Sequence, residues 1–166
     1  MAELRHLIRE VPDFPHRGIL FKDITPLLLD PSAFADCISQ LAARVPRPEA
    51  VVAIESRGFV FGATLALEWR VPFVPARKFG KLPGRTMRQV YSLEYGEDTL
   101  EIHTDALRRG QRVVIVDDLL ATGGTAAAAA KLVEQLDARI DALLFVIELA
   151  GQGGREKLSP HRVEAE

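Results

Sequence analysis

Short apolar runs alternate with longer segments of mixed polarity along the 166 residues of the chain. The apolar runs, rich in valine, isoleucine and leucine, cover residues 50–54, 71–76, 112–116 and 142–147. Runs of this kind are typical of parallel strands that are buried on both faces. Segments with helical length and pattern cover residues 3–9, 31–44, 58–69 and 125–136. The alternation predicts an α/β fold with a mainly parallel twisted sheet flanked by helices.

Local signals refine this prediction. Asp30 precedes Pro31, which is the arrangement of an N-cap followed by proline at the first helical position. Residues 89–95 and 99–103 read as two strands joined by a Gly-Glu-Asp turn, and we expect a hairpin beside the main sheet. Neither repeats nor linkers interrupt the pattern, so residues 1–166 are predicted to form a single domain.

Residues 117–125 carry the clearest chemical signal. They read Asp-Asp-Leu-Leu-Ala-Thr-Gly-Gly-Thr and lie between the apolar run and an alanine-rich segment, which predicts a strand, an acidic turn, a glycine-threonine loop and a helix. The glycines allow several N–H groups to converge, and the helix N-terminus adds the positive end of its dipole, so a phosphate is the natural occupant. Two carboxylates facing that phosphate would repel it. We therefore expect a sugar to lie between the phosphate and the two carboxylates, which would accept hydrogen bonds from its vicinal hydroxyls. This arrangement indicates a ribose 5-phosphate.

Each fragment of this segment also has a structural interpretation. An Asp pair after a strand is common in loops, and Gly-Gly-Thr alone fits a turn followed by a helix cap. The segment lacks the Gly-Lys-Ser/Thr of a Walker loop and the spacing of a dinucleotide-binding loop. The unbroken combination favours the sugar-phosphate site.

Two further segments suit a diphosphate. Glu-Ser-Arg-Gly at 55–58 follows an apolar run and offers backbone amides and a guanidinium, although a plain strand-to-helix turn reads the same. Residues 77–88 hold five basic side chains and no acidic one, which suits either a mobile loop that closes on a leaving anion or an ordinary solvated loop. In a parallel sheet, Glu55, Arg77 and Asp117 would all lie at the carboxyl edge.

Residues 114–125 resemble the 5-phosphoribosyl-1-pyrophosphate (PRPP) binding motif of the type I phosphoribosyltransferases. Other segments resemble the adenine-specific members of that family in order and spacing, and they cover residues 14–15, 18–26, 55–59, 77–84 and 91–96. The resemblance extends from about residue 3 to residue 160. It implies the type I phosphoribosyltransferase fold and the transfer of a phosphoribosyl group from PRPP to adenine, which gives AMP and pyrophosphate in purine salvage.

The resemblance also implies roles for individual residues. The ribose is assigned to Asp117 and Asp118, and the 5-phosphate to Ala121, Thr122, Gly123, Gly124 and Thr125. Pyrophosphate is assigned to Glu55, Ser56, Arg57, Arg77, Lys78 and Lys81, with a cis peptide expected between Glu55 and Ser56. Magnesium is expected as Mg-PRPP, held through the substrate and water, with no dedicated protein ligand assigned and Asp117 and Asp118 as the candidate contacts.

Base recognition and proton transfer are likewise implied by the resemblance. A small hood over about residues 1–28 would cover adenine, with Phe21 stacking on the base and the backbone around Leu20 and Lys22 reading its edge. Glu94 would exchange a proton with the base, within a flexible loop and hairpin at 77–103. From the residues alone, Phe21 also fits a core aromatic, and Glu94 an exposed carboxylate on a strand.

Composition excludes some partners. A net charge of −2 gives no global attraction to nucleic acid or membranes, and no apolar run approaches the roughly 20 residues needed to cross a bilayer. The N-terminus lacks a signal-peptide pattern, so a cytoplasmic location is expected. Cys37 has no partner for an internal disulfide and is placed on the buried side of a helix. The four histidines lack metal-ligand spacing. A homodimer, with a loop residue contributed across the interface, is expected from the resemblance only.

One departure and two alternatives accompany this interpretation. The family continues after a segment like residues 154–158 into an apolar closing strand, whereas residues 161–166 are polar here, which puts that strand in doubt. A transferase for another base, such as xanthine or orotate, is one alternative. A regulator that senses PRPP without catalysis is the other, but it would need a nucleic-acid-binding element, and we find none in the sequence.

Overall fold

The computed structural model describes residues 2–92 and 96–165, and its contacts divide into two compact units, Met1–Ala43 and Arg44–Glu166. The first unit contains η1 (Ala2–Leu7), β1 (Arg9–Pro12), β2 (Leu20–Asp23), α1 (Thr25–Leu29) and α2 (Pro31–Ala43). Strands β1 and β2 pair in antiparallel fashion, with Arg9 opposite Asp23. The predicted helix at 3–9 is therefore wrong at its end, because residues from Arg9 onwards form a strand whose backbone groups pair with β2.

Helix α2 begins as its sequence predicts. The carboxylate of Asp30 accepts hydrogen bonds from the N–H groups of Ser32 and Ala33, each at 3.0 Å. These bonds satisfy amides that a helix start otherwise leaves without partners. Cys37 lies on the buried side of this helix, as expected.

The second unit is built around a seven-stranded sheet. Its elements are β3 (Ala50–Ile54), α3 (Gly58–Trp69), β4 (Phe73–Lys78), β5 (Thr86–Ser92), β6 (Glu97–His103), β7 (Arg112–Leu120), α4 (Gly124–Gln135), β8 (Arg139–Glu148), α5 (Gly154–Leu158) and β9 (Val163–Glu164). The strand order is β5-β6-β4-β3-β7-β8-β9. Strands β4, β3, β7, β8 and β9 are mutually parallel, which confirms the mainly parallel sheet.

The β5–β6 hairpin continues this sheet. We expected the hairpin beside the sheet, but β6 pairs in antiparallel fashion with β4, with Arg77 opposite Glu101. Both strands begin earlier than the sequence suggested, and β5 starts at Thr86 inside the basic segment. The pairing brings this basic segment into the sheet at both of its ends.

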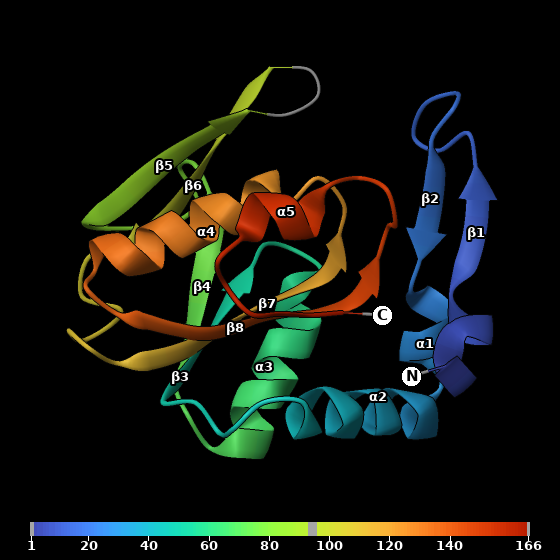
Figure 1. Cartoon of the computed structure of the whole chain (residues 1–166), viewed down its shortest axis with the longest axis horizontal. Coiled ribbons are helices and arrows are strands. Elements are labelled where there is room, and N and C mark those ends of the chain that lie inside the picture. Colours follow the sequence, from blue (N-terminus) through green and yellow to red (C-terminus); the bar gives the residue numbers. More distant parts are fainter. Residues whose placement is uncertain (1, 93–95, 166) are drawn as a thin grey trace. The chain divides into compact units, whose positions relative to one another are not determined.

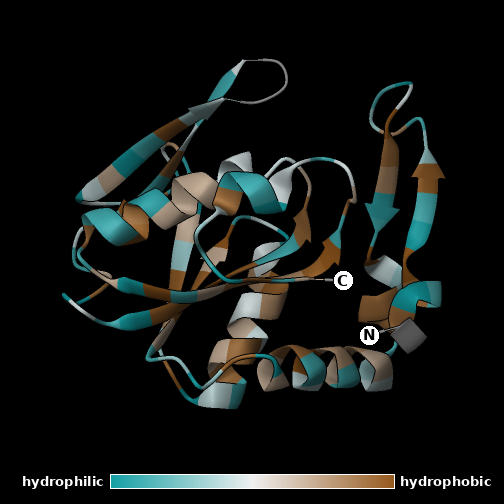
Figure 2. Ribbon diagram, viewed as in Figure 1, coloured by the Kyte–Doolittle hydropathy of each residue, from teal (hydrophilic) through white to brown (hydrophobic). Residues whose placement is uncertain are grey.

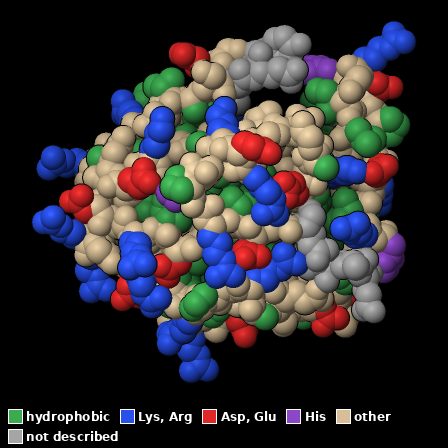
Figure 3. All heavy atoms as spheres, viewed as in Figure 1, with side chains coloured by type: hydrophobic (Ala, Val, Ile, Leu, Met, Phe, Trp, Pro, Cys, Tyr) green, Lys and Arg blue, Asp and Glu red, His purple; other side chains and the backbone are tan. Residues whose placement is uncertain are grey.

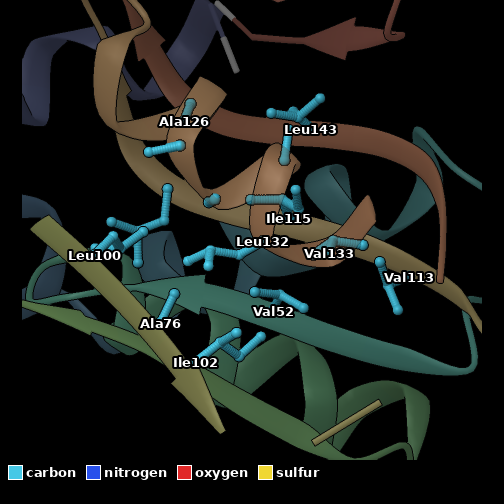
Figure 4. Close-up of a cluster of buried hydrophobic side chains, with 14 of the residues drawn as sticks. Val52, Ala76, Leu100, Ile102, Val113, Ile115, Ala126, Leu132, Val133 and Leu143 are labelled. Atoms are coloured by element: carbon cyan, nitrogen blue, oxygen red, sulfur yellow. The ribbon is translucent and has the colours of Figure 1, made fainter. Parts of the chain in front are cut away.

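Helices α3 and α4 cover opposite faces of the sheet (Figure 1). Alternate residues of a strand point to opposite faces. Val52 belongs to the buried cluster that includes Leu132 and Val133 of α4, whereas the neighbouring Ala53 faces Gly62 of α3. Figure 4 shows the α4 side of this core, and Figure 2 shows largely hydrophobic colouring along α3. The two buried faces explain why β3 is apolar at every position.

The chain ends in a short strand despite its polar sequence. Val163 and Glu164 form β9 and pair with Leu143 and Leu144 of β8. The doubt about a closing strand is therefore not supported, because β9 pairs with β8 and the side chains of Val163 and Ala165 pack against the hydrophobic core.

The visible surface has mixed charge. Figure 3 shows basic and acidic side chains interspersed over the face in view. Among the described residues, none of the helices combines the length and apolar character that crossing a membrane requires.

Candidate active site

The segment from Asp117 to Thr125 joins the central strand to α4. Strand β7 extends to Leu120, so both aspartates lie within the strand and the predicted acidic turn is wrong. The pairing with β8 explains the extension, since it continues to Leu120 opposite Glu148. Gly123 has a φ of 76°, the left-handed conformation that glycine adopts readily, and α4 begins at Gly124. The first amides of this helix have no intrahelical partner, which is the geometry that the predicted anion site requires.

The two aspartates have unusual electrostatics. Asp118 is 2% exposed and Asp117 is half-buried, and the Asp118 N–H donates to Oδ1 of Asp117 at 2.9 Å. Burial raises the pKa of Asp117 well above its usual range, and repulsion from Asp118 raises it further. Burial also raises the pKa of Asp118, but the Arg57 guanidinium opposes this shift. The pair therefore binds a proton or a polar ligand more readily than an exposed pair would.

Arg57 connects this pair to the neighbouring strand. Its Nε lies 3.0 Å from Oδ2 of Asp118. That oxygen nevertheless forms no hydrogen bond of good geometry within the described part of the chain. A buried carboxylate oxygen without a hydrogen bond costs free energy, which makes it a candidate for contact with a ligand.

Close packing around the aspartates and the loop requires two glycines, Gly58 and Gly154, whose packing role the sequence did not reveal. A Cβ atom on Gly58, the first residue of α3, would lie 2.8 Å from Oδ1 of Asp117. A Cβ atom on Gly154, the first residue of α5, would lie 2.3 Å from the carbonyl oxygen of Ala121. Both contacts are shorter than a side chain tolerates. The sequence signal was the position of each glycine at a helix start, but only the fold shows what each one faces.

A second cluster lies at the ends of β3 and β4, around the side chain of Glu55. The peptide bond between Glu55 and Ser56 is cis, as expected. The carboxylate of Glu55 accepts hydrogen bonds from Arg77 Nη2 at 3.0 Å, from the Lys78 N–H at 3.0 Å and from Lys81 Nζ at 2.7 Å. Burial would raise the pKa of Glu55, but these partners lower it to about 2. Three of the residues predicted to bind pyrophosphate therefore converge on one carboxylate.

The ends of the basic segment are tied to a buried acid. Glu101 on β6 is 1% exposed, and it accepts hydrogen bonds from the Gly80 N–H at 2.8 Å, Thr86 Oγ1 at 3.1 Å and Arg88 Nε at 2.8 Å. The Arg88 guanidinium also lies 4.5 Å from the centre of the Phe79 ring. Glu101 thus holds both ends of the basic segment, at Gly80 just after β4 and at Thr86 and Arg88 where β5 begins.

The predicted base-binding residues lie in the N-terminal unit. Leu20, Phe21 and Lys22 form most of β2, and the Phe21 ring packs edge-on against Phe14 at a centroid distance of 5.1 Å. Lys22 pairs with Glu10 across the hairpin. Glu94, the predicted proton-transfer residue, lies outside the described residues. The structure thus brings together the predicted phosphate, ribose and pyrophosphate residues within residues 44–166.

Comparison with known proteins identifies this arrangement. Residues 28–160 match the family model described as the phosphoribosyl transferase domain. The chain belongs to the phosphoribosyltransferase family. The family and fold expected from the sequence are thereby confirmed.

Individual relatives narrow the assignment within the phosphoribosyltransferases. The adenine phosphoribosyltransferase of Carboxydothermus hydrogenoformans is 56% identical over 97% of this chain and 96% of its own length. The crystal structure of the enzyme from Thermoanaerobacter pseudethanolicus has a TM-score of 0.95 at 52% identity, covering 99% of this chain and 96% of that one. The Saccharomyces cerevisiae enzyme, solved with an imino-altritol bisphosphate and adenine, has a TM-score of 0.92 at 44% identity, with coverage of 99% and 96%. These relatives are all adenine phosphoribosyltransferases.

Proposed function

We propose that this phosphoribosyltransferase moves the 5-phosphoribosyl group from PRPP to adenine and forms AMP and pyrophosphate. The main support is the Asp117–Asp118 pair at the end of β7, which is followed directly by the glycine loop and the N-terminus of α4. The relatives support the choice of adenine, because the yeast enzyme was solved with adenine and an imino-altritol bisphosphate.

PRPP would be held both at its 5-phosphate and at its pyrophosphate. Backbone amides from Ala121 to Thr125, with the hydroxyls of Thr122 and Thr125, hold the 5-phosphate at the N-terminus of α4. Asp117 and Asp118 accept hydrogen bonds from the ribose hydroxyls, directly or through water. The ribose hydroxyls relieve the mutual repulsion of the Asp117 and Asp118 carboxylates. Ribose binding therefore recovers part of the electrostatic cost of placing the two carboxylates together away from water.

The pyrophosphate end meets cations that are already paired with carboxylates. Arg77 and Lys81 pair with Glu55, Lys78 pairs with Asp98, and Arg57 pairs with Asp118. Glu55 carries negative charge and would repel a diphosphate directly. We infer that it acts through its partners by holding them at the ends of β3 and β4 until the substrate arrives, with Ser56 and Arg57 completing the turn.

Magnesium fits this site as a substrate-bound ion. Within residues 2–92 and 96–165, no cluster of three histidine, cysteine or carboxylate side chains could form a protein-only metal site. The unsatisfied Oδ2 of Asp118 and the adjacent Asp117 offer oxygen ligands, and Mg²⁺ usually binds through one or two carboxylates, water and substrate phosphates. These two residues would hold it, and the ion would supply partial neutralisation of the diphosphate charge.

In the chemical step adenine attacks C1′ of PRPP and loses a proton, so the site must supply an acceptor for that proton. N9 of adenine forms a bond to C1′ as the bond from C1′ to the pyrophosphate oxygen breaks, and Glu94 takes the proton from N7; in the reverse direction Glu94 returns it. Phe21 stacks on the base while the backbone of Leu20 and Lys22 reads the exocyclic amine, and a matched polar edge rejects oxo-purines. Closure of residues 77–88 keeps water from hydrolysing PRPP.

The organisation of the protein is part of the proposal. A single catalytic domain includes the hood at about 1–28 and the flexible loop and hairpin at 77–103. A homodimer and a cytoplasmic location also follow from the sequence expectations and the family. Neither a nucleic acid nor a membrane is required as a partner.

The decisive experiment is a substrate panel. The protein is incubated with PRPP, Mg²⁺ and each of adenine, hypoxanthine, guanine, xanthine and orotate, and pyrophosphate release is followed. Only adenine should react appreciably. Release with xanthine or orotate would identify a transferase for another base. Tight PRPP binding without release for any base would indicate a non-catalytic sensor.

A further inference from the structure

An acid on the β5–β6 hairpin holds one of the cations assigned to pyrophosphate. Oδ2 of Asp98 lies 3.0 Å from Nζ of Lys78. Asp98 belongs to β6 and Lys78 is the last residue of β4, so the contact joins two neighbouring strands. Lysine has a flexible four-carbon stem and a compact charge, and its ammonium group must be held by other groups to occupy one position.

The Asp98 carboxylate is itself held at both oxygens. Oδ1 accepts a hydrogen bond from the Thr99 N–H at 2.8 Å, and Oδ2 accepts one from the Tyr91 hydroxyl at 3.2 Å. Tyr91 lies directly opposite Asp98 in the β5–β6 ladder. Its side chain is 9% exposed, so a packed ring places the hydroxyl. These contacts leave the carboxylate little freedom to rotate away from Lys78.

Tyr91 also contacts the predicted 5-phosphate loop. Its hydroxyl oxygen accepts a hydrogen bond from the Thr125 side chain. A Cβ atom on Gly124 would lie 3.9 Å from the Tyr91 ring, which shows how closely the ring approaches the start of α4. A chain of polar contacts therefore links Thr125, Tyr91, Asp98 and Lys78.

The part of this chain from Tyr91 to Lys78 can survive substrate binding. The single proton of the Tyr91 hydroxyl is donated to Asp98, so that contact remains when Thr125 turns its own proton towards a phosphate oxygen. The Lys78 ammonium has three N–H groups, so it can contact Asp98 and a substrate oxygen together. Asp98 and Lys78 need not separate for Lys78 to reach the pyrophosphate.

We propose that Asp98 and Tyr91, whose ring lies beside the 5-phosphate loop, are positioning residues that aim Lys78 at the pyrophosphate of PRPP. The proposal rests on the proposed function, because it assumes that PRPP occupies these two subsites. Neither residue touches the reacting atoms, and both act through Lys78.

Two conservative variants test the proposal in steady-state assays. Asp98→Asn keeps the shape but removes the charge, and Tyr91→Phe keeps the ring but removes the hydroxyl. Because a hydrogen bond to a charged group is lost or weakened, each should raise the KM for PRPP about tenfold, with the KM for adenine changed by less than about twofold. Ser92→Ala is the matched control, since it removes a hydroxyl from the adjacent, exposed position of the same strand. Its KM for PRPP should stay at the wild-type value.

A double-mutant cycle separates positioning from a structural role. In a Lys78→Met background, Asp98→Asn and Tyr91→Phe should each change the KM for PRPP by less than about twofold, because the residue they position is absent. Equal effects in both backgrounds would overturn the proposal, and so would an unchanged KM in the single variants. A parallel loss in kcat, in both KM values and in the thermal midpoint would show that the residues only hold the hairpin together. If the wild-type protein fails to form AMP, the proposed function fails instead.

Discussion

Replacing Asp117 by asparagine should stabilise the protein at neutral pH while it impairs catalysis. The folded protein binds a proton at Asp117 more tightly than the unfolded chain does, because the pKa of Asp117 is raised by burial and by Asp118. Stability therefore falls as the pH rises from the ordinary aspartate range through the raised pKa, and the penalty is complete above it. Asparagine removes this charge and can still accept the hydrogen bond from the Asp118 N–H.

The size of the effect follows from the cost of a buried and poorly paired polar group, about 1–3 kcal/mol. For a chain of this size, each 1 kcal/mol shifts the thermal midpoint by about 2–4 °C, so Asp117→Asn should melt roughly 2–12 °C higher than the wild type near pH 7.5. The difference should shrink towards pH 4, where the wild-type carboxyl is protonated.

The measurement is a series of urea and thermal unfolding curves between pH 4 and pH 8, accompanied by assays of AMP formation. Asp105→Asn is the control, because it removes the same charge from an exposed position and should leave the pH dependence unchanged. If the stability curves of Asp117→Asn and the wild type run parallel from pH 4 to pH 8, the electrostatic strain at Asp117 does not exist. Retained activity in this variant would remove Asp117 from the ribose site.

Three other variants test the rest of the site. Glu55→Gln should lower the stability at pH 7 by about 1–3 kcal/mol. This difference should disappear as the pH falls from 4.5 through 2, because the folded pKa of Glu55 is about 2. Denaturation at several pH values checks this, and a difference that persists at pH 2 contradicts it. Gly58→Ala should cost about 1–3 kcal/mol through overpacking and reduce activity by displacing Asp117, whose Oδ1 would lie 2.8 Å from the new Cβ; an unchanged melting temperature would refute the close packing. Glu94→Gln should slow turnover about 10²–10⁴-fold while PRPP affinity stays nearly constant, and equal losses in rate and affinity would assign Glu94 a structural role.

Sequence patterns were most reliable where they reflect local physics. The apolar strands, the helices at 31–44 and 58–69, and the Asp30 cap all occur close to where they were predicted. A strand buried on both faces must be apolar throughout, and a helix start needs an acceptor for its free amides. The motif at 117–125 was informative for the same reason, because strand, glycine loop and helix start are contiguous in the chain.

The predicted ends of strands were wrong where pairing with a strand far away in the sequence decided them. Asp117 and Asp118 were expected in a turn, but pairing with β8 keeps them in the strand. Val163 and Glu164, within a mostly polar segment, form a strand because β8 offers them a free edge. Local propensity cannot show such pairings, since their hydrogen bonds join residues widely separated along the chain.

By itself, the sequence determined the order of the elements and the chemical character of the site: a glycine loop before a helix start, adjacent carboxylates and a basic segment. Only the tertiary structure decided how these charges are balanced. The fold places Glu55 among three predicted pyrophosphate ligands, Asp98 against Lys78, and Arg57 against Asp118. Electrostatic energy depends on distance and burial in space, and spacing along the chain specifies neither.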